Sequence, residues 1–389
     1  MSGRALQVEQ SLRRLREAAE ALARPVAFME VCGTHTVAAF RSGLHSLMPQ
    51  NVSLLSGPGC PVCVTSQGDI DLLISAGSVP DVTVCTYGDM LRVTGSGGSL
   101  EQARSRGADV RVVYSTMDAL KLAKENPGRQ VVFAAVGFET TAPASAIAVL
   151  EAKRQGVGNF TVLVSHKLIM PAMRALLGAG EVNVAGFLLP GHVSVILGAR
   201  TFDPVADEYG LPCVIAGFED YQIAAAMARL CEMVRDGVVR AENQYPQAVN
   251  GAGNTHAQAV IEQAFEPADA TWRGLGELPG SGLRLRGELA EFDAASRFGL
   301  KRQEVPEPPG CRCGEVITGK CTPADCRLFG KVCTPIRPVG PCMVSSEGTC
   351  QAWFKYNRAR ASAAASRATS AAAGQGMCLS GQAVEGGVR

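Results

Sequence analysis

Short apolar runs alternate with amphipathic segments through roughly the first two thirds of the chain. The runs are β-branched and lack clean alternation of polar and apolar positions, which is typical of strands covered on both faces. They span Val26–Val31, Val52–Leu55, Val82–Thr86, Val110–Tyr114, Val131–Val136, Thr161–Ser165, Val184–Leu189 and Cys213–Ala216. Helical periodicity appears between them at Ile70–Ala76, Met117–Glu125, Ala142–Gln155, Pro171–Leu177 and Tyr221–Asp236. This alternation predicts an α/β fold with mainly parallel sheets.

The same pattern suggests a division into domains. The predicted strands could form one sheet, but a break at Asn126-Pro127-Gly128 makes two smaller sheets equally plausible. In the second arrangement, two Rossmann-like α/β domains would span residues 1–126 and 127–240. A helical pattern persists at His256–Phe265, after which Pro, Gly and charged residues replace the apolar runs. Residues 241–358 are expected to form a C-terminal domain. From Cys311 on, cysteine, Gly and Pro replace a hydrophobic core, and a stretch so poor in aliphatic residues needs a bound metal or cluster to stabilise it. The Ala/Ser-rich residues 359–389 are expected to be a disordered tail.

Charge and hydropathy exclude several classes of protein. The formal net charge of +1 gives no strong field for nucleic acid or an acidic membrane surface. No run of 18 apolar residues occurs, so no membrane span is expected. The first residues lack a signal-peptide core and instead follow a helical pattern of Leu and Ala among Arg and Glu. A cytoplasmic location is the default expectation.

Cysteine usage changes this ordinary picture. The chain has 14 cysteines, and seven of them fall close together near its end: Cys311, Cys313, Cys321, Cys326, Cys333, Cys342 and Cys350. In a large chain without a secretion signal, such a pattern favours metal or redox chemistry over structural disulfides.

The first candidate site is Glu30-Val31-Cys32-Gly33-Thr34-His35-Thr36, directly after a predicted strand. Ligands of open α/β sheets bind at the carboxyl ends of the strands. Cys32 and His35 could reach one metal or one proton there, and the following helix should lower the pKa of the thiol. The alternative interpretation is a buried cysteine beside a capping threonine and a surface histidine.

The second candidate is Cys60-Pro61-Val62-Cys63, again between a strand and a helix. A Cys-x2-Cys pair just before a helix suits a redox dithiol, because the helix end stabilises one thiolate. It also suits half of a zinc site, with Cys32 and His35 as the other half.

The third candidate is the cysteine-rich end of the chain. Four thiolates are the usual demand of a [4Fe–4S] cluster, and a zinc site also uses four, typically as two close pairs. Only Cys311 and Cys313 are close in sequence, so the wide spacing favours a cluster over zinc.

Two further loops follow apolar strands. They are Gly137–Pro143, which contains Glu139, and Pro190–Ser194, which contains His192. Glu139 could be a base, a ligand or a surface acid, and His192 could line a cleft or be structural. Neither a P-loop nor a Gly-x-Gly-x2-Gly after the first strand is present, so dinucleotide or P-loop chemistry is unsupported.

Taken in order, these segments resemble the hydrogenase maturation protein HypD family, from about Pro25 to Tyr356. The motifs that carry the resemblance are MEVCGTHT at Met29–Thr36, GPGCPVC at Gly57–Cys63, GFETTAP at Gly137–Pro143, PGHVS at Pro190–Ser194, NQYPQAV at Asn243–Val249, WRGLG at Trp272–Gly276 and GPCMVSSEGTC at Gly340–Cys350.

The resemblance implies a platform on which a HypC-type chaperone and this chain assemble the Fe(CN)2CO group of nickel–iron hydrogenases. A HypE-type protein would donate the cyanide, and the hydrogenase large subunit would be served indirectly. Cys32 would be an iron ligand shared with the chaperone, with His35 beside the iron. Cys60 and Cys63 would be the redox dithiol, and Glu139 and His192 would line the same cleft.

The resemblance also implies a [4Fe–4S] cluster. The ligands that fit the family spacing are Cys311, Cys326, Cys333 and Cys350, with Cys313 as the competitor of Cys311. Two other functions stay open: a thiol–disulfide oxidoreductase that uses the Cys60–Cys63 pair, and a zinc-stabilised binding protein.

Overall fold

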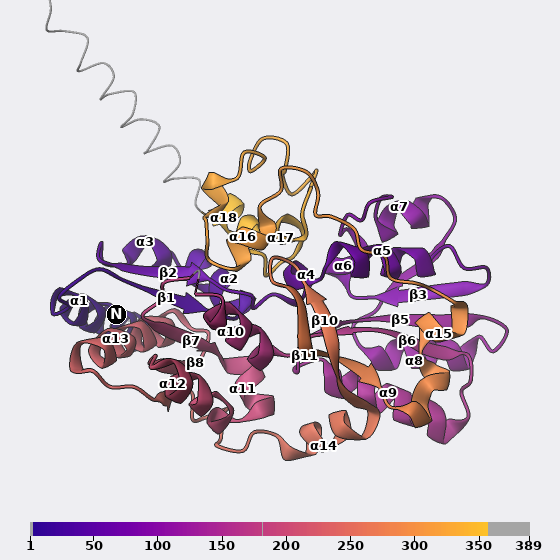
Figure 1. The fold of residues 1–389 in the computed structure, drawn as a ribbon, viewed down its shortest axis with the longest axis horizontal. Helices are drawn as coiled ribbons and strands as arrows, with labels where there is room; N and C mark the ends of the chain where they lie inside the picture. Colours follow the sequence, from indigo (N-terminus) through magenta and orange to yellow (C-terminus); the bar gives the residue numbers. More distant parts are fainter. Residues whose placement is uncertain (1–2, 181, 357–389) are drawn as a thin grey trace, which may run out of the picture.

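Two parallel sheets form the body of the molecule. The structure is a computed structural model that describes residues 3–180 and 182–356 (Figure 1). Figure 1 shows the sheets side by side, with a β-hairpin between them and the cysteine-rich end (yellow) above. The predicted α/β class with two parallel sheets is confirmed, whereas the predicted tail at 359–389 lies outside the described residues.

The first sheet is assembled from two separate parts of the chain. Its five described strands have the order β2-β1-β7-β8-β9, and all neighbours are parallel. The strands are β1 (Val26–Glu30), β2 (Val52–Ser56), β7 (Gly186–Pro190), β8 (Cys213–Ala216) and β9 (Ala241–Asn243).

The second sheet uses only the intervening residues. Its four described strands have the order β4-β3-β5-β6 and are also parallel. They are β3 (Val82–Thr86), β4 (Asp109–Val112), β5 (Gln130–Gly137) and β6 (Phe160–His166). The predicted domain boundary at residue 126/127 falls between β4 and β5, and these strands belong to one sheet because β3 pairs with both of them.

Burial explains why these residues form strands. Every residue of β3, β7 and β8 is buried, and β5 is buried from its second residue onward. Strands covered on both faces need continuous apolar runs, and parallel sheets in α/β proteins are covered in this way.

Helices fill the connections between strands. In the connections of the first sheet they are α1 (Gly3–Glu20), α2 (Gly33–Arg41), α3 (Leu44–Leu47), α10 (Ile169–Gly178), α11 (Gly191–Leu197), η1 (Ala199–Phe202), α12 (Asp203–Tyr209) and α13 (Asp220–Asp236). Those around the second sheet are α4 (Pro61–Val64), α5 (Gln67–Ala76), α6 (Gly88–Leu91), α7 (Leu100–Ser105), α8 (Thr116–Glu125), α9 (Ala142–Gln155) and α14 (Thr255–Ala264). Among the described helices, none combines the length and apolar character needed to span a bilayer.

An antiparallel hairpin joins the two sheets. Strands β10 (Phe265–Trp272) and β11 (Gly276–Leu285) pair with an irregularity between Ala268 and Ala270. β11 packs against β6 of the second sheet and against α10, which leads to β7 of the first. The short elements η2 (Gly287–Phe292) and α15 (Ala294–Phe298) then follow β11.

The cysteine-rich end has only short elements, namely α16 (Cys313–Ile317), η3 (Pro323–Asp325), α17 (Pro341–Val344) and α18 (Thr349–Tyr356). Helix α18 packs on α2, and α16 and α17 both pack on α4. The cysteine-rich end therefore covers the two loops that carry the sequence-predicted cysteines Cys32, Cys60 and Cys63.

Candidate metal and redox site

The Cys32 and Cys60 loops lie against each other at the carboxyl ends of β1 and β2. The amide of Gly33 donates a hydrogen bond to the carbonyl of Gly59 at 3.0 Å. A Cβ atom on Gly59 would lie 2.1 Å from the backbone nitrogen of Cys32. Only glycine permits this close backbone approach, so the glycine that precedes Cys60 brings the two sequence-predicted sites together.

Cys60 and Cys63 are joined as a disulfide with a Cα–Cα distance of 5.2 Å. Cys60 is the N-cap of α4, and its Sγ accepts the backbone N–H of Cys63 at 3.2 Å. Pro61 favours this turn because its fixed φ and missing N–H suit the first helical position. Both cysteines are buried, so the bond lies inside the protein.

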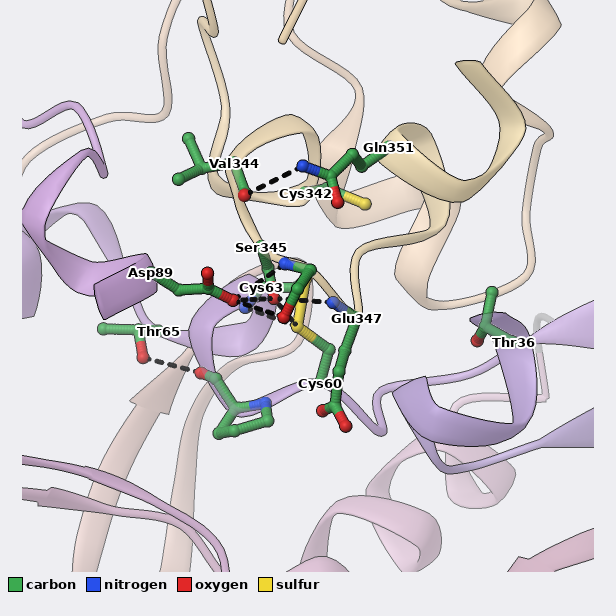
Figure 2. The surroundings of a disulfide bond; sticks show 12 residues. Thr36, Cys60, Cys63, Thr65, Asp89, Cys342, Val344, Ser345, Glu347 and Gln351 are labelled. Atoms are coloured by element: carbon green, nitrogen blue, oxygen red, sulfur yellow. Dashed lines mark hydrogen bonds between the residues drawn. A yellow bond between two sulfur atoms is a disulfide. The ribbon is translucent and has the colours of Figure 1, made fainter. Parts of the chain in front are cut away.

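A loop from the cysteine-rich end closes over the disulfide (Figure 2). Ser345 Oγ lies 3.3 Å from Cys60 Sγ. The backbone N–H and the hydroxyl of Ser346 donate to Asp89 Oδ2 at 2.7 and 2.8 Å, which fixes the loop. Ser345 follows Cys342 by one helical turn of α17, so this short helix connects the disulfide with the C-terminal cysteines.

Two acids surround Cys32. Glu30 accepts the backbone N–H of Cys32 at 2.8 Å and the hydroxyl of Thr36. Glu347, from the loop over the disulfide, accepts the hydroxyl of Thr34 at 2.6 Å. Burial raises the pKa of Glu30 to about 8 and also raises that of Glu347.

These surroundings overturn one expectation. Cys32 does precede α2, whose N-terminus was expected to lower the pKa of the thiol. Burial, helped by the charges of Glu347 and Glu30, instead raises the pKa of Cys32 to about 12. Desolvation outweighs the backbone N–H groups of Thr34 and His35 that point at the sulfur. Cys32 is therefore a neutral thiol at neutral pH.

His35 and His192 meet across one aromatic ring. The ring of Phe218 lies 4.7 Å from that of His35 and 3.9 Å from that of His192, which it stacks upon. His35 is buried and its Nε2–H donates to the carbonyl of Gly217 at 3.0 Å. Its Nδ1 has no hydrogen-bond partner among the described residues. Burial lowers the pKa of His35 to about 4, so the ring is neutral and Nδ1 offers a lone pair.

Glu139 lies elsewhere. It follows β5 of the second sheet, whereas Cys32 and His192 follow β1 and β7 of the first. Its Oε1 accepts the backbone N–H of Ile169 at the start of α10, at 2.9 Å. It also lines a separate, largely apolar cavity of about 340 Å³ with Leu168 and Phe265. The structure thus brings His192 close to His35 but gives Glu139 a different environment.

Three buried cysteines gather in the C-terminal region. The sulfur atoms of Cys313, Cys342 and Cys350 all lie within 4.8 Å of one another. The backbone N–H of Cys350 donates to Cys342 Sγ at 3.2 Å. Hydrogen bonds from the thiols of Cys313 and Cys350 lower the pKa of Cys342, so one thiolate is favoured within the group. Cys311 borders it, because a Cβ on Gly340 would lie 2.7 Å from its Sγ and 2.6 Å from that of Cys313.

This group differs from the set that the family spacing implies. Cys350 belongs to both sets, and Cys311 lies beside the group. Cys333 is buried and its Sγ accepts the N–H of Val339 at 3.3 Å. The sulfur of Cys326 lies 3.8 Å from the carbonyl of Gly310, outside the group.

The spatial group contains Cys342, which the family spacing does not include, and Cys313, the competitor of Cys311. Helix α18 packs on both α17 and α16, which brings these cysteines together. Spacing along the chain does not show such packing. The only signal for Cys342 was its place in the Gly340–Cys350 motif.

The chemistry of these donors fits a thiolate-bound metal or cluster. The three cysteines are buried and their region has few apolar residues to hold it together. Soft thiolates suit zinc and iron–sulfur clusters, and a backbone N–H on sulfur supports the thiolate form. Cys313, Cys342 and Cys350 would hold the group, with Cys311 or Cys333 as the fourth ligand.

Fold and site together define a protein with two parallel sheets, a buried disulfide at their junction and a cysteine group that could bind metal. Comparison with known proteins gives the family. The profile of the HypD family, described as "Hydrogenase formation hypA family", matches residues 7–357. The chain belongs to this family.

Curated relatives agree with this assignment. The hydrogenase maturation factor HypD of Escherichia coli is 46% identical over 357 residues, covering 90% of this chain and 96% of the relative. That of Cupriavidus necator is 47% identical over 339 residues, covering 85% and 89%. Hydrogenase maturation factor HypD2 of Bradyrhizobium diazoefficiens is 46% identical over 345 residues, covering 87% and 91%.

Proposed function

We propose that this chain is the scaffold on which, together with a HypC-type chaperone, the Fe(CN)2CO group of nickel–iron hydrogenases is assembled. Its relatives are named hydrogenase maturation factors. The observation that carries the proposal is the meeting of three elements: the Cys32 loop, the Cys60–Cys63 disulfide and the loop that follows Cys342. An iron bound to Cys32 would lie beside a disulfide that can accept two electrons. The C-terminal cysteine group would lie one helical turn beyond the loop that covers this disulfide.

Cys32 would bind the iron, which is the cargo of the scaffold. A metal cation displaces the proton of a thiol on binding. Glu347 is close enough to the Cys32 loop to take up that proton, and burial raises its pKa, which makes it a stronger base than a free carboxylate. His35 Nδ1 has no hydrogen-bond partner among the described residues and would serve as either a ligand or a hydrogen-bond acceptor.

The Cys60–Cys63 pair would exchange electrons with the cargo. Reduction of the disulfide takes up two electrons and two protons and gives two thiols, and the reverse reaction returns them. A [4Fe–4S] cluster at the C-terminal cysteines would supply single electrons from an external low-potential carrier. Ser345 links the two sulfur sites, because its Oγ contacts Cys60 Sγ and the residue lies one helical turn after Cys342.

A HypE-type cyanide donor and the hydrogenase large subunit would be the further partners. The scaffold would act in the cytoplasm and need neither nucleic acid nor a membrane. His192 would line the cargo site through Phe218. Glu139, in the second sheet, would act outside that site.

A zinc-stabilised binding protein is the second candidate, favoured by one observation. Sulfur atoms around a tetrahedral zinc lie about 3.8 Å apart, as Zn–S bonds of about 2.3 Å require, and the three sulfurs here lie within 4.8 Å. Metal and sulfide analysis of protein purified without oxygen distinguishes the two. Iron with acid-labile sulfide supports the scaffold, and zinc alone contradicts its cluster.

The central test is Cys32→Ala, with Cys231→Ala as the matched control. Cys231 is also a buried free cysteine, but it lies in α13 away from the site. After co-expression with the other maturation proteins, wild type and control should show infrared bands of bound cyanide and carbon monoxide. Cys32→Ala should keep its fold and C-terminal metal but lose these bands and fail to mature hydrogenase. Normal maturation by Cys32→Ala would mean that the iron is held elsewhere.

A further inference from the structure

Arg273 is a buried cation in the turn between β10 and β11. Its side chain is 0% exposed. The preceding Trp272 is anchored by an Nε1–H bond to Ser281 Oγ at 2.9 Å and packs near Phe138. That anchor points the turn into the protein, where the guanidinium is enclosed.

The guanidinium is fixed to the segment that directly follows the disulfide. The backbone N–H of Arg273 donates to the carbonyl of Val64 at 2.8 Å. Its Nε–H donates to the carbonyl of Thr65 at 3.2 Å, and its Nη2 donates to Gln67 Oε1 at 3.2 Å. Val64 is the residue after Cys63, so these bonds tie the arginine to the end of α4.

The other side of the same turn touches the C-terminal cysteines. A Cβ on Gly274 would lie 2.5 Å from the carbonyl oxygen of Gly314, the neighbour of Cys313. The turn that carries Arg273 therefore contacts both the segment that follows Cys63 and the backbone beside Cys313.

The charge of Arg273 is poorly balanced. Its Nη1 has no hydrogen-bond partner among the described residues. The carboxylate paired with it is that of Glu307, whose Oε2 lies 3.4 Å away on a side chain that is 35% exposed. A buried charge is costly unless it is compensated, and an arginine in a protein keeps its charge. Reduction of the disulfide gives two thiols, and a thiol that then ionises, or a thiolate that binds a metal, would add negative charge near Arg273.

We propose that Arg273 is a positioning residue whose fixed positive charge favours the reduced, more negatively charged forms of both the Cys60–Cys63 pair and the C-terminal metal group. For the metal group this rests on the proposed function. For the disulfide it rests only on the bonds to Val64, Thr65 and Gln67.

The test measures both midpoint potentials in the full chain, purified without oxygen. Mass spectrometry after differential alkylation gives the fraction of Cys60–Cys63 disulfide in dithiothreitol buffers at pH 8.5, where an ordinary thiol is about half ionised. A dye-mediated titration of visible absorption gives the potential of the metal group. The variants are Arg273→Gln, Arg273→Lys and Glu307→Gln. The control is Arg284→Gln, an exposed arginine of the same hairpin that is paired with Glu266.

At an effective dielectric of about 20 and a separation on the order of 10 Å, one unit charge changes an equilibrium that creates another unit charge by roughly tenfold. Arg273→Gln should therefore make reduction less favourable, on the order of tenfold where reduction adds a full unit of negative charge. This corresponds to a midpoint about 30 mV lower for the two-electron dithiol and about 59 mV lower for a one-electron centre. Arg273→Lys should restore most of the shift, and Arg284→Gln should cause none.

Glu307→Gln should shift both midpoints the opposite way, because it removes the counter-charge and leaves Arg273 in place. This variant decides the question even if Arg273→Gln does not fold. Equal potentials in wild type and Glu307→Gln would overturn the proposal, as would equal shifts in the Gln and Lys variants of Arg273. A chain with no redox-active metal would refute the proposed cluster, yet the dithiol measurement would still test the role of Arg273.

Discussion

Glu139 gives the sharpest test of how burial acts in this protein. Its Oε1 accepts the N–H of Ile169, but its Oε2 has no partner among the described residues. Burial raises the pKa of Glu139 to about 7 from an ordinary value of 4.5. No cation is among the causes of this shift. The substitution Glu139→Gln removes the ionisable proton while keeping an oxygen that can accept from Ile169.

The sign and size of the effect follow from the two pKa values. Below pH about 4.5 the carboxyl is protonated in both the folded and unfolded chains, so its titration does not change the free energy of unfolding. As the pH rises, the unfolded chain ionises first, so the folded state loses relative stability until the pH passes about 7. A shift of one unit is about 1.4 kcal/mol, so the full loss is about 3 kcal/mol. Glutamine does not incur this loss.

The assay is thermal unfolding of both proteins at pH 5 and pH 8. Glu139→Gln should be within about 1 kcal/mol of wild type at pH 5 and about 3 kcal/mol more stable at pH 8. The expected rise in Tm at pH 8 is about 6–12 °C, since about 1 kcal/mol shifts the Tm of a domain of about 150–250 residues by about 2–4 °C. Comparing the two proteins at each pH cancels the titration of all other groups.

The reasoning would be refuted if the stability gain of Glu139→Gln over wild type were no larger at pH 8 than at pH 5. Glu139 would then be ionised and stabilised in the folded protein. Loss of hydrogenase maturation by a well-folded Glu139→Gln protein would instead give this carboxyl a chemical role. The sequence pattern alone left that role open.

Three further outcomes are expected. Cys342→Ser should lower metal content per chain, whereas Cys326→Ser should not; loss in the latter would support the ligand spacing of the family over the spatial group. Gly33→Ala should lower stability by about 1–3 kcal/mol, since its Cβ would lie 2.6 Å from that of Glu347, and an unchanged Tm would contradict that packing. Peptide mapping of air-oxidised protein should recover Cys60 linked to Cys63, and two free thiols in folded protein would remove the redox role.

Local patterns located most of the strands correctly. Val82–Thr86 and Cys213–Ala216 match β3 and β8 residue for residue, because strands buried on both faces carry continuous apolar runs. The hairpin β10–β11 was missed, since β10 is buried only at Phe265 and Trp272, and the residues between them, which include Pro267 and Asp269, are half-buried or exposed and form no apolar run. The partition of strands between sheets was also missed, because any apolar run can pair with any other.

The site was predictable where residue type and strand ends coincide. Cys32, His35 and Cys60 all follow strands of the first sheet, and the structure brings them together. Glu30 and Glu347 were missed because an acid in a sequence does not reveal its own burial. Glu347 reaches Thr34 across 313 positions of the chain, and no local pattern records such a contact.

The split first sheet has a consequence for synthesis on the ribosome. β2 ends at Ser56, and the strand that completes the pairing of β1 begins only at Gly186. Protein synthesis adds about 5–20 residues per second, so one edge of β1 stays unpaired for roughly 10 s while the second sheet is synthesised. An unpaired edge invites pairing with other chains. The nascent Cys32 loop therefore has no β7 beside it until the second sheet has emerged.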